Sequence, residues 1–363
     1  MTTFVLLKLT VGADSFFLNA AAVLTSAVVA MLSFVFLFRK QRYLRQQKRA
    51  SVRHLFSDLI AETAICESPQ EVQATLQAFL AVNGKLVQKP FARQVLIKAL
   101  VKIKDDISGS SAENLRLLFE QLGLDKDCYQ QFLSKRWHIK AKAIQQLAEM
   151  QQHQYLVKIY RETNHANKFI RTEAQIAIVK LTGFKGLRFL NIISHPVSQW
   201  QQLSLLHQLK EGAADEENIR TWLSSPNPTV VEFALRLTEV YKCYQLHADV
   251  VASLQHSSAV VRLQALHALR EVYDDNTTEV LMRYFPAAAK PEKLLVLELL
   301  GELGTGEKEL SFLQALLSAG DESLRYNALQ AIQRIGPNAD DGRAEDLEPA
   351  ALPLLSILTK KAV

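Results

Sequence analysis

The residues that could bind metals or act as nucleophiles are widely separated in this chain of 363 residues. The three cysteines, Cys66, Cys128 and Cys243, form no Cys-x-x-Cys pair, so the sequence supports neither a zinc site nor a redox motif. Unpaired cysteines in an odd number are typical of a reducing compartment. His247, His256 and His267 are close in sequence, but spacings of 9 and 11 do not place two of them together on one helix as metal ligands.

The common catalytic motifs are missing from the sequence. There is no Gly-rich phosphate loop, no Gly-x-Ser-x-Gly elbow and no His-Glu-x-x-His pair. Glu162, Asp215, Glu216 and Glu217 fall where turns or helix starts are expected, and acidic residues favour the positive end of the helix dipole there. We therefore predict no catalytic residue, no metal and no cofactor, and we do not expect an enzyme.

Tryptophans and glutamine pairs are the remaining candidates for a binding surface. Trp137, Trp200 and Trp222 fall at helical core spacing, so we expect them to pack inside the fold rather than stack on a ligand. The glutamine pairs (Gln145-Gln146, Gln151-Gln152 and Gln201-Gln202) are expected on solvated faces, with a polar groove as the alternative.

A weak motif recurs about every 31 residues and must position these side chains. It is clearest at Val261-Arg262, which is followed by alanines and leucines at helical spacing. Related copies lead from Ile139, Ile170, Trp200, Val230 and Leu324, and a further unit contains Lys293. A fixed period of this size predicts one small helical unit stacked many times.

Each unit is expected to contain two helices, the first longer than the second. Apolar residues at i, i+3, i+4 and i+7 define the first helix, and Gly183, Gly304 and Gly336 follow first helices as C-terminal caps. Asn227, Ser257 and Asp321 are expected N-caps.

The pair of Val, Ile or Leu with Arg or Lys, followed by alanines and a Gly cap, resembles the HEAT family, and more closely its short repeats named after phycobilisome lyases. The resemblance covers roughly residues 134–336 and implies an all-α, right-handed α-solenoid of stacked helix pairs. The basic residue that follows each lead position is expected to be structural; these are Lys140, Arg171, Arg262, Lys293 and Arg325.

An apolar run without charge extends over residues 16–38, long enough to cross a roughly 30 Å hydrocarbon core at about 1.5 Å per residue. Basic residues follow it, so the positive-inside rule predicts a single-pass inner-membrane protein with its N-terminus outside and its solenoid in the cytoplasm. The alternatives are a cleaved signal peptide, whose basic residues should precede the run, and a buried soluble helix. The predicted basic membrane flank consists of Arg39, Lys40, Arg42, Arg45, Lys48, Arg49 and Arg53.

The charge is concentrated at this flank. Residues 1–54 hold eight basic residues and one acidic residue, a net +7, so the rest of the +5 chain carries −2. The flank is expected to mark topology and contact anionic lipids, with a nucleic-acid arm as the alternative.

The predicted organisation therefore has six parts. They are a short N-terminus (1–15), the membrane helix (16–38), a basic juxtamembrane segment (39–54), a helical part or degenerate repeats (55–133), the HEAT-like repeats (134–336), and a flexible acidic link with a capping helix (337–363).

The function expected from this organisation is a membrane-anchored scaffold that binds a protein partner, a component of a bacterial inner-membrane complex. One alternative is a bilin-lyase-like or other small-molecule-handling HEAT enzyme. The other is a nucleic-acid-binding HEAT protein, which requires a basic binding face that the −2 charge disfavours.

Overall fold

The computed structural model describes residues 2–104, 107–209, 214–318 and 320–335, and the side chains of residues 2–25, 44, 45 and 48 lie outside the description. Within these ranges every regular element is a helix and none is a strand, which confirms the all-α prediction. The chain divides into two compact units: residues 1–133 with 149–151, and residues 134–148 with 152–363.

The first unit is built around the C-terminal part of a long helix, α1. Its elements are α1 (Thr2–Ala64), α2 (Pro69–Val87), α3 (Pro90–Lys104), α4 (Gly109–Gln121) and α5 (Leu124–Phe132). Phe56, Leu59 and Ile60 are buried on one side of α1, which packs against α2, α3 and α4. Ser68 caps α2 by accepting from the Glu71 amide, as a Ser before Pro in a helix start predicts.

The predicted transmembrane anchor at residues 16–38 is wrong, and so is the single-pass inner-membrane location. No helix among the described residues combines the length and the apolar character needed to cross a membrane. The helix α1 continues without a break from Thr2 to Ala64, through the basic segment. Residues 16–25 of the predicted span lie outside the described side chains.

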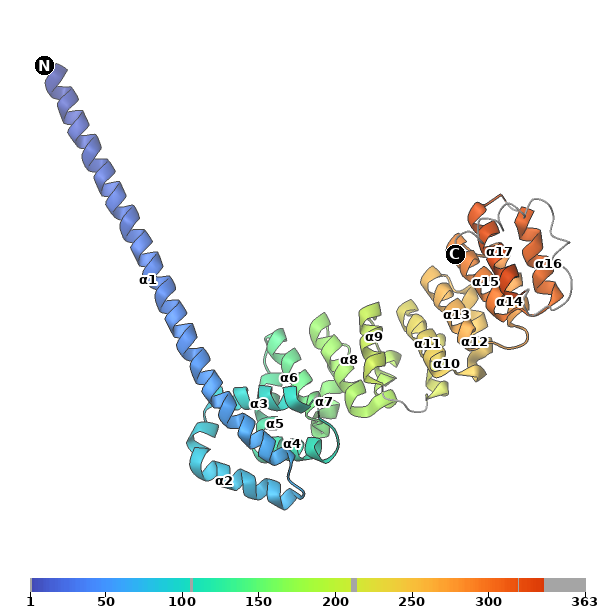
Figure 1. Cartoon of the computed structure of the whole chain (residues 1–363), viewed down its shortest axis with the longest axis horizontal. Helices are drawn as coiled ribbons and strands as arrows, with labels where there is room; N and C mark the ends of the chain where they lie inside the picture. Colours follow the sequence, from blue (N-terminus) through green and yellow to red (C-terminus); the bar gives the residue numbers. More distant parts are fainter. Residues whose placement is uncertain (1, 105–106, 210–213, 319, 336–363) are drawn as a thin grey trace, which may run out of the picture. The chain divides into compact units, whose positions relative to one another are not determined.

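The second unit consists of longer first helices alternating with shorter second elements (Figure 1). The first helices are α6 (Trp137–Glu149), α8 (Lys168–Thr182), α9 (Gln199–Gln208), α11 (Pro228–Tyr241), α13 (Ala259–Glu271), α15 (Lys290–Leu303) and α17 (Glu322–Ile335). The second elements are α7 (Leu156–Tyr160), the 3-10 helix η2 (Gly183–Asn191), α10 (Glu216–Leu223), α12 (His247–Ala252), α14 (Thr277–Tyr284) and α16 (Glu307–Ala315).

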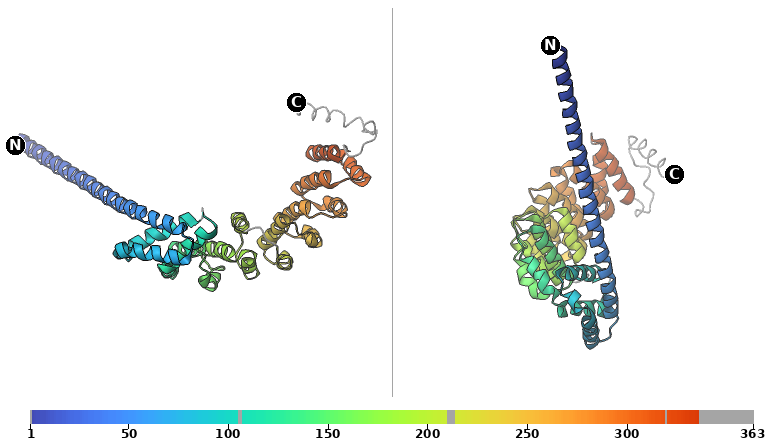
Figure 2. Two further views of the ribbon diagram at one scale, coloured as in Figure 1. Left: turned by 60° about the horizontal axis from the view of Figure 1, so that its bottom comes forward. Right: turned by 90° about the vertical axis from the view of Figure 1, so that its left-hand side faces the viewer.

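Neighbouring first helices pack on one another in the second unit, α8 on α9 and α11, α13, α15 and α17 in turn, an arrangement consistent with an α-solenoid. The helices α11, α13, α15 and α17 form a continuous series, visible from yellow to red in Figure 2. Their facing sides contribute small and branched apolar residues such as Ala265, Leu266, Leu297 and Ala328, all buried. Alanine at these positions lets neighbouring helices approach closely, as the recurring alanines predict.

The caps and the ends of the chain test the predicted boundaries. Asn227 caps α11 as predicted, whereas the cap of α13 is Ser258 rather than Ser257. Gly183 ends α8 with a φ of 61°, a conformation that favours glycine. The predicted parts 1–15 and 337–363, with the Gly336 cap and the terminal capping helix, lie outside the residues whose placement or side chains are described.

A close approach of two helices in the second unit supports a stability prediction. A Cβ on Gly301 of α15 would lie 2.8 Å from Cα of Ala331 in α17, so Gly301→Ala forces the two helices apart. We expect the substitution to lower the free energy of unfolding by about 1–3 kcal/mol, although alanine favours helix by about 1 kcal/mol. Urea denaturation followed by circular dichroism measures the change. Gly84→Ala, in α2 with no atom within 4 Å, is the control and should be neutral or stabilising. A Gly301→Ala variant as stable as the wild type would contradict the prediction.

Candidate functional site

Three aromatic side chains lie exposed in the first turns of consecutive first helices. Trp137 begins α6, Phe169 is the second residue of α8, and Trp200 is the second residue of α9. Their exposed fractions are 45%, 48% and 65%, high for residues of this size. We call these three residues the aromatic edge. Exposed large apolar side chains that recur in the first turns of consecutive helices mark a binding surface more than single scattered ones do.

The structure places Trp200 differently from the sequence prediction. Ile170 and Val230 lie three residues after the caps of their helices, Asn167 and Asn227, and both are buried. The cap of α9 is Ser198, so the equivalent position is Gln201, which is buried. Trp200 is therefore in the outward position that Phe169 occupies in the preceding helix.

Only one of the three tryptophans occupies the predicted core position. The indole of Trp222 in α10 is buried, and its Nε1 donates to Oδ1 of Asn191 at 2.5 Å. Trp137 and Trp200 are exposed, which contradicts the expectation that all three pack inside.

The aromatic edge is partly ordered by its own contacts. The rings of Trp137 and Phe169 stack with centroids 4.6 Å apart and planes inclined by 21°. Nζ of Lys168 lies 5.1 Å from the centroid of the Phe169 ring, within the range of a cation–π contact. On α9, Leu203 is exposed one turn after Trp200 and extends the apolar surface.

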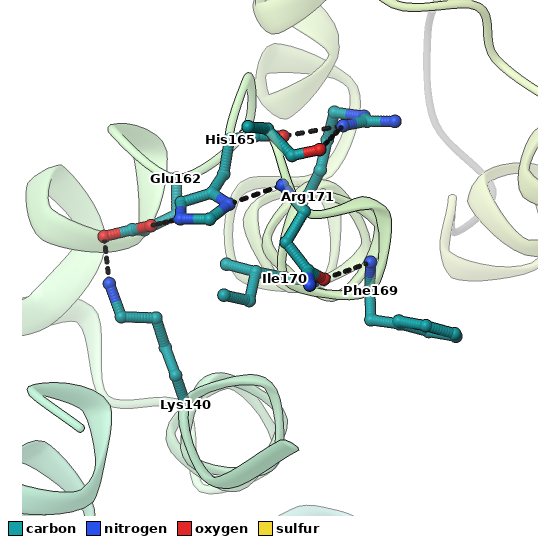
Figure 3. A network of polar contacts seen from close by, with 8 residues as sticks. Lys140, Glu162, His165, Phe169, Ile170 and Arg171 are labelled. Atoms are coloured by element: carbon teal, nitrogen blue, oxygen red, sulfur yellow. Dashed lines mark hydrogen bonds and ion pairs between the residues drawn. The ribbon is translucent and has the colours of Figure 1, made fainter. Parts of the chain in front are cut away.

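Polar contacts behind the edge fix the first turn of α8 (Figure 3). Nζ of Lys140 lies 2.8 Å from Oε1 of Glu162, which joins α6 to the turn before α8. Nη1 of Arg171 donates to the backbone oxygens of His165, at 2.6 Å, and Ala166, at 3.2 Å. Figure 3 shows the Phe169 side chain pointing away from this network. The turn is thus held by charged hydrogen bonds while its aromatic residue faces outward.

The other basic residues of the repeat make varied contacts. Arg262 donates to the backbone oxygens of His256 and Ser257, the same pattern as Arg171, and also binds Glu292. Nζ of Lys293 lies 5.4 Å from the ring centroid of Phe285. The Arg325 amide donates to the Asp321 oxygen, and its buried Nε has no hydrogen-bond partner among the described residues. A structural role for the five basic positions remains a prediction.

Buried polar residues replace the apolar lead residue in two repeats. Oε1 of Gln201 accepts from the amide and the hydroxyl of Ser198, and its Nε2 donates to Oε1 of Gln175 in α8 at 2.8 Å. Oε1 of Glu292 in α15 lies 2.7 Å from Nη2 of Arg262 in α13, and its Oε2 accepts from the Tyr284 hydroxyl at 2.5 Å. Burial and the adjacent Glu292 carboxylate raise the pKa of Tyr284 to about 12. Each polar lead residue therefore has a partner in the preceding first helix.

Charged residues on α11 to α17 bind one another across the first helices. Arg236 donates to Gln264, which in turn donates to Glu239 at 2.6 Å. Farther along, Arg270 pairs with Glu298 at 2.8 Å and with Glu302 at 3.0 Å. We call this series the charged ladder. Its charges are largely matched within the chain, in contrast to the aromatic edge.

The basic residues predicted as a membrane flank lie along α1. The described side chains of Arg39, Lys40, Arg42, Arg49 and Arg53 are exposed. The Arg42 guanidinium lies 5.8 Å from the Phe38 ring centroid, and that of Arg49 lies 5.7 Å from the ring of Phe91 in α3. The side chains of Arg45 and Lys48 lie outside the description.

Among the described residues, those with suitable chemistry form no catalytic arrangement. Nε2 of His247 lies 2.9 Å from the Thr277 hydroxyl and Nδ1 lies 3.2 Å from Asp274, but Thr277 is fully buried and donates to Asp274. Burial raises the pKa of the Cys243 thiol to about 11, which keeps it protonated and unreactive. In the part of the chain that the structure describes, no group of His, Cys, Asp and Glu could hold a metal ion.

Comparisons with known proteins find likenesses in structure but none in sequence family. No protein-family model and no curated protein matches the sequence. An engineered protein is similar in structure at 13% identity, with 86% of this chain and 95% of that chain covered and a TM-score of 0.33. Human deoxyhypusine hydroxylase in complex with glycerol is 14% identical over 79% of this chain and 98% of its own, with a TM-score of 0.31. Kap121p bound to Nup53p is 13% identical over 85% of this chain and 35% of its own, with a TM-score of 0.32. Likenesses at these identities and scores carry no argument about function.

Proposed function

We propose that this protein is a scaffold whose helical repeats bind a protein partner through the aromatic edge. The observation that carries the proposal is the exposure of Trp137, Phe169 and Trp200 in the first turns of the consecutive first helices α6, α8 and α9. Tryptophan and other aromatic residues are enriched at protein interfaces and in their energetic centres. Each exposed ring is attached to a turn that is fixed by caps or ion pairs, which limits the entropy lost on binding.

The repeats of the second unit are proposed to be HEAT-like and to wind into a right-handed solenoid. The repeat period, the paired helices and the packing of α11, α13, α15 and α17 support this assignment. In such an array the first helices present one extended surface, on which the aromatic edge precedes the charged ladder in chain order.

Site-specific photo-crosslinking in the native host tests the proposal. A photoreactive phenylalanine derivative placed at Trp200 or Phe169 of the full-length chain should form a discrete adduct with one protein. Tyr244, which is 58% exposed in the short 3-10 helix Tyr244–Leu246 before α12, is the control position and should form none. Trp137→Ala should reduce the yield at position 200 by disturbing the edge. Equal adducts at all three positions, or none at any, would contradict the proposed interface.

A further inference from the structure

The two halves of the repeat region carry opposite charge. Residues 134–200 contain eleven Lys and Arg against three Asp and Glu, a net +8, whereas residues 201–336 contain twelve against eighteen, a net −6. The −2 of the whole chain beyond residue 54 hides this division. The aromatic edge lies entirely in the positive half, so its partner meets a positive potential.

Exposed cations flank the aromatic residues themselves. Lys135 and Arg136 immediately precede Trp137 and are exposed, and Lys168 lies against the Phe169 ring. Acidic residues nearby do little to neutralise them, since Glu162 is bound by Lys140. Glu173 on α8 is partly buried, and burial raises its pKa. The edge therefore combines apolar surface with unbalanced positive charge.

In the charged ladder, by contrast, the charged side chains are paired with one another within the chain. On α13 to α17, Arg270 pairs with Glu298 and Glu302, and Arg334 lies 3.6 Å from Glu302. Opposite charges there are matched between adjacent helices. The positive charge around the aromatic edge differs, because residues 134–200 contain only three Asp and Glu against eleven Lys and Arg.

We propose that the aromatic edge receives an acidic segment of the partner protein that also carries large apolar side chains. This inference rests on the proposed function and specifies the partner's chemistry. The apolar side chains would pack on Trp200 and Leu203, and the carboxylates would pair with Lys135, Arg136 and Lys168.

A single-stranded nucleic acid fits the edge less well, although it too is acidic. Bases bind such proteins by stacking on open aromatic faces. The faces of Trp137 and Phe169 cover each other at 4.6 Å, so no base fits between them. Trp200 and Leu203 instead offer the apolar surface that a leucine or phenylalanine side chain requires.

Binding of defined probes to the full-length chain tests the inference. The probes are a short fluorescein-labelled peptide rich in glutamate with two central phenylalanines, the same peptide with lysine for glutamate, and a labelled oligothymidylate. The edge variant carries Lys135→Glu, Arg136→Glu and Lys168→Glu. The control variant carries Arg161→Glu, Lys185→Glu and Arg188→Glu, which changes the net charge equally at exposed positions on or beside the second elements of the same repeats.

The glutamate peptide should bind the wild type, and both the edge variant and Trp200→Ala should weaken it by about tenfold or more. The control variant loses the same charge away from the edge, so it should weaken binding of the glutamate peptide by less than about twofold. No binding, equal weakening by both triple variants, or tighter binding of the lysine peptide would overturn the inference. Tighter binding of oligothymidylate through the same cations would also overturn it and assign the edge to nucleic acid.

Crosslinking separates this inference from the function on which it rests. If position 200 captures the same protein with equal yield in the wild type and the edge variant, the scaffold function stands and the acidic partner does not. If no adduct forms at position 200 in the wild type, the proposed function itself fails. Retention of the wild-type melting transition shows that the edge variant is folded.

Discussion

Replacing Trp222 with alanine is expected to lower the free energy of unfolding by about 3–5 kcal/mol, whereas the same change at Trp200 should alter it by about 0.5 kcal/mol or less. Trp222 is 2% exposed, and its ring lies 6.0 Å from the Phe184 ring in a stacked arrangement. Removing the indole leaves a cavity between α10 and α11 and removes the hydrogen bond to Asn191. Trp200 has 65% of its surface in water, so truncation there removes little packing.

This pair of variants compares one residue type in two environments. Urea denaturation of the full-length chain measures the loss, and hydrogen exchange of α10 and α11 locates it, because repeats can unfold locally. Trp222→Phe should recover part of the loss, since it restores ring packing but not the hydrogen bond. Equal effects of alanine at positions 200 and 222 would contradict the assignment of Trp200 to the surface.

Replacing Arg262 with methionine is expected to cost about 2–4 kcal/mol. The Glu292 carboxylate is almost fully buried, and Arg262 is its cationic partner. Breaking such a pair leaves an uncompensated buried charge, which usually costs about 3–5 kcal/mol. The Arg262 side chain is 22% exposed, so water compensates part of this cost. The substitution also removes the donors to the His256 and Ser257 oxygens.

Two further measurements test that explanation. Adding Glu292→Gln to Arg262→Met should recover about 1 kcal/mol or more, because the neutral amide needs no cation.

Burial alone would raise the pKa of Glu292, but hydrogen bonds from Arg262, Tyr284 and the Ala289 amide outweigh it and lower the pKa. Its stabilising contribution is therefore complete above the unfolded value of about 4.3 and is lost as the pH falls through the lower folded value. The gap between wild type and Arg262→Met should be widest near neutral pH and shrink in acid. A gap that grows in acid would contradict this.

The repeat architecture could be predicted because its signals are local and repeated. Apolar spacing, recurring alanines and caps such as Asn227 each favour the same helix, so errors at one position are corrected by the others. Membrane placement had no such repetition. It depended on one apolar run, whereas no helix among the described residues is long and apolar enough to cross a membrane.

The aromatic edge was missed because one lead position was assigned by hydrophobicity instead of by the helix start. Ser198 and Gln201 form a capping box in the sequence Ser-x-x-Gln, and this box fixes the start of α9. Counting three residues from Ser198 reaches Gln201 and places Trp200 outside. The Trp137 and Phe169 stack had no local signal, because it joins residues of two repeats.

The buried lead residues Gln201 and Glu292 also make the order of the repeats specific. Each needs one particular neighbour, Gln175 for the first and Arg262 for the second. Exchanging or deleting a single unit would place the Glu292 carboxylate or the Gln201 amide opposite an apolar surface of another first helix. The array therefore cannot be shortened, lengthened or shuffled freely as a consensus array can, and variation in its length should occur at its ends.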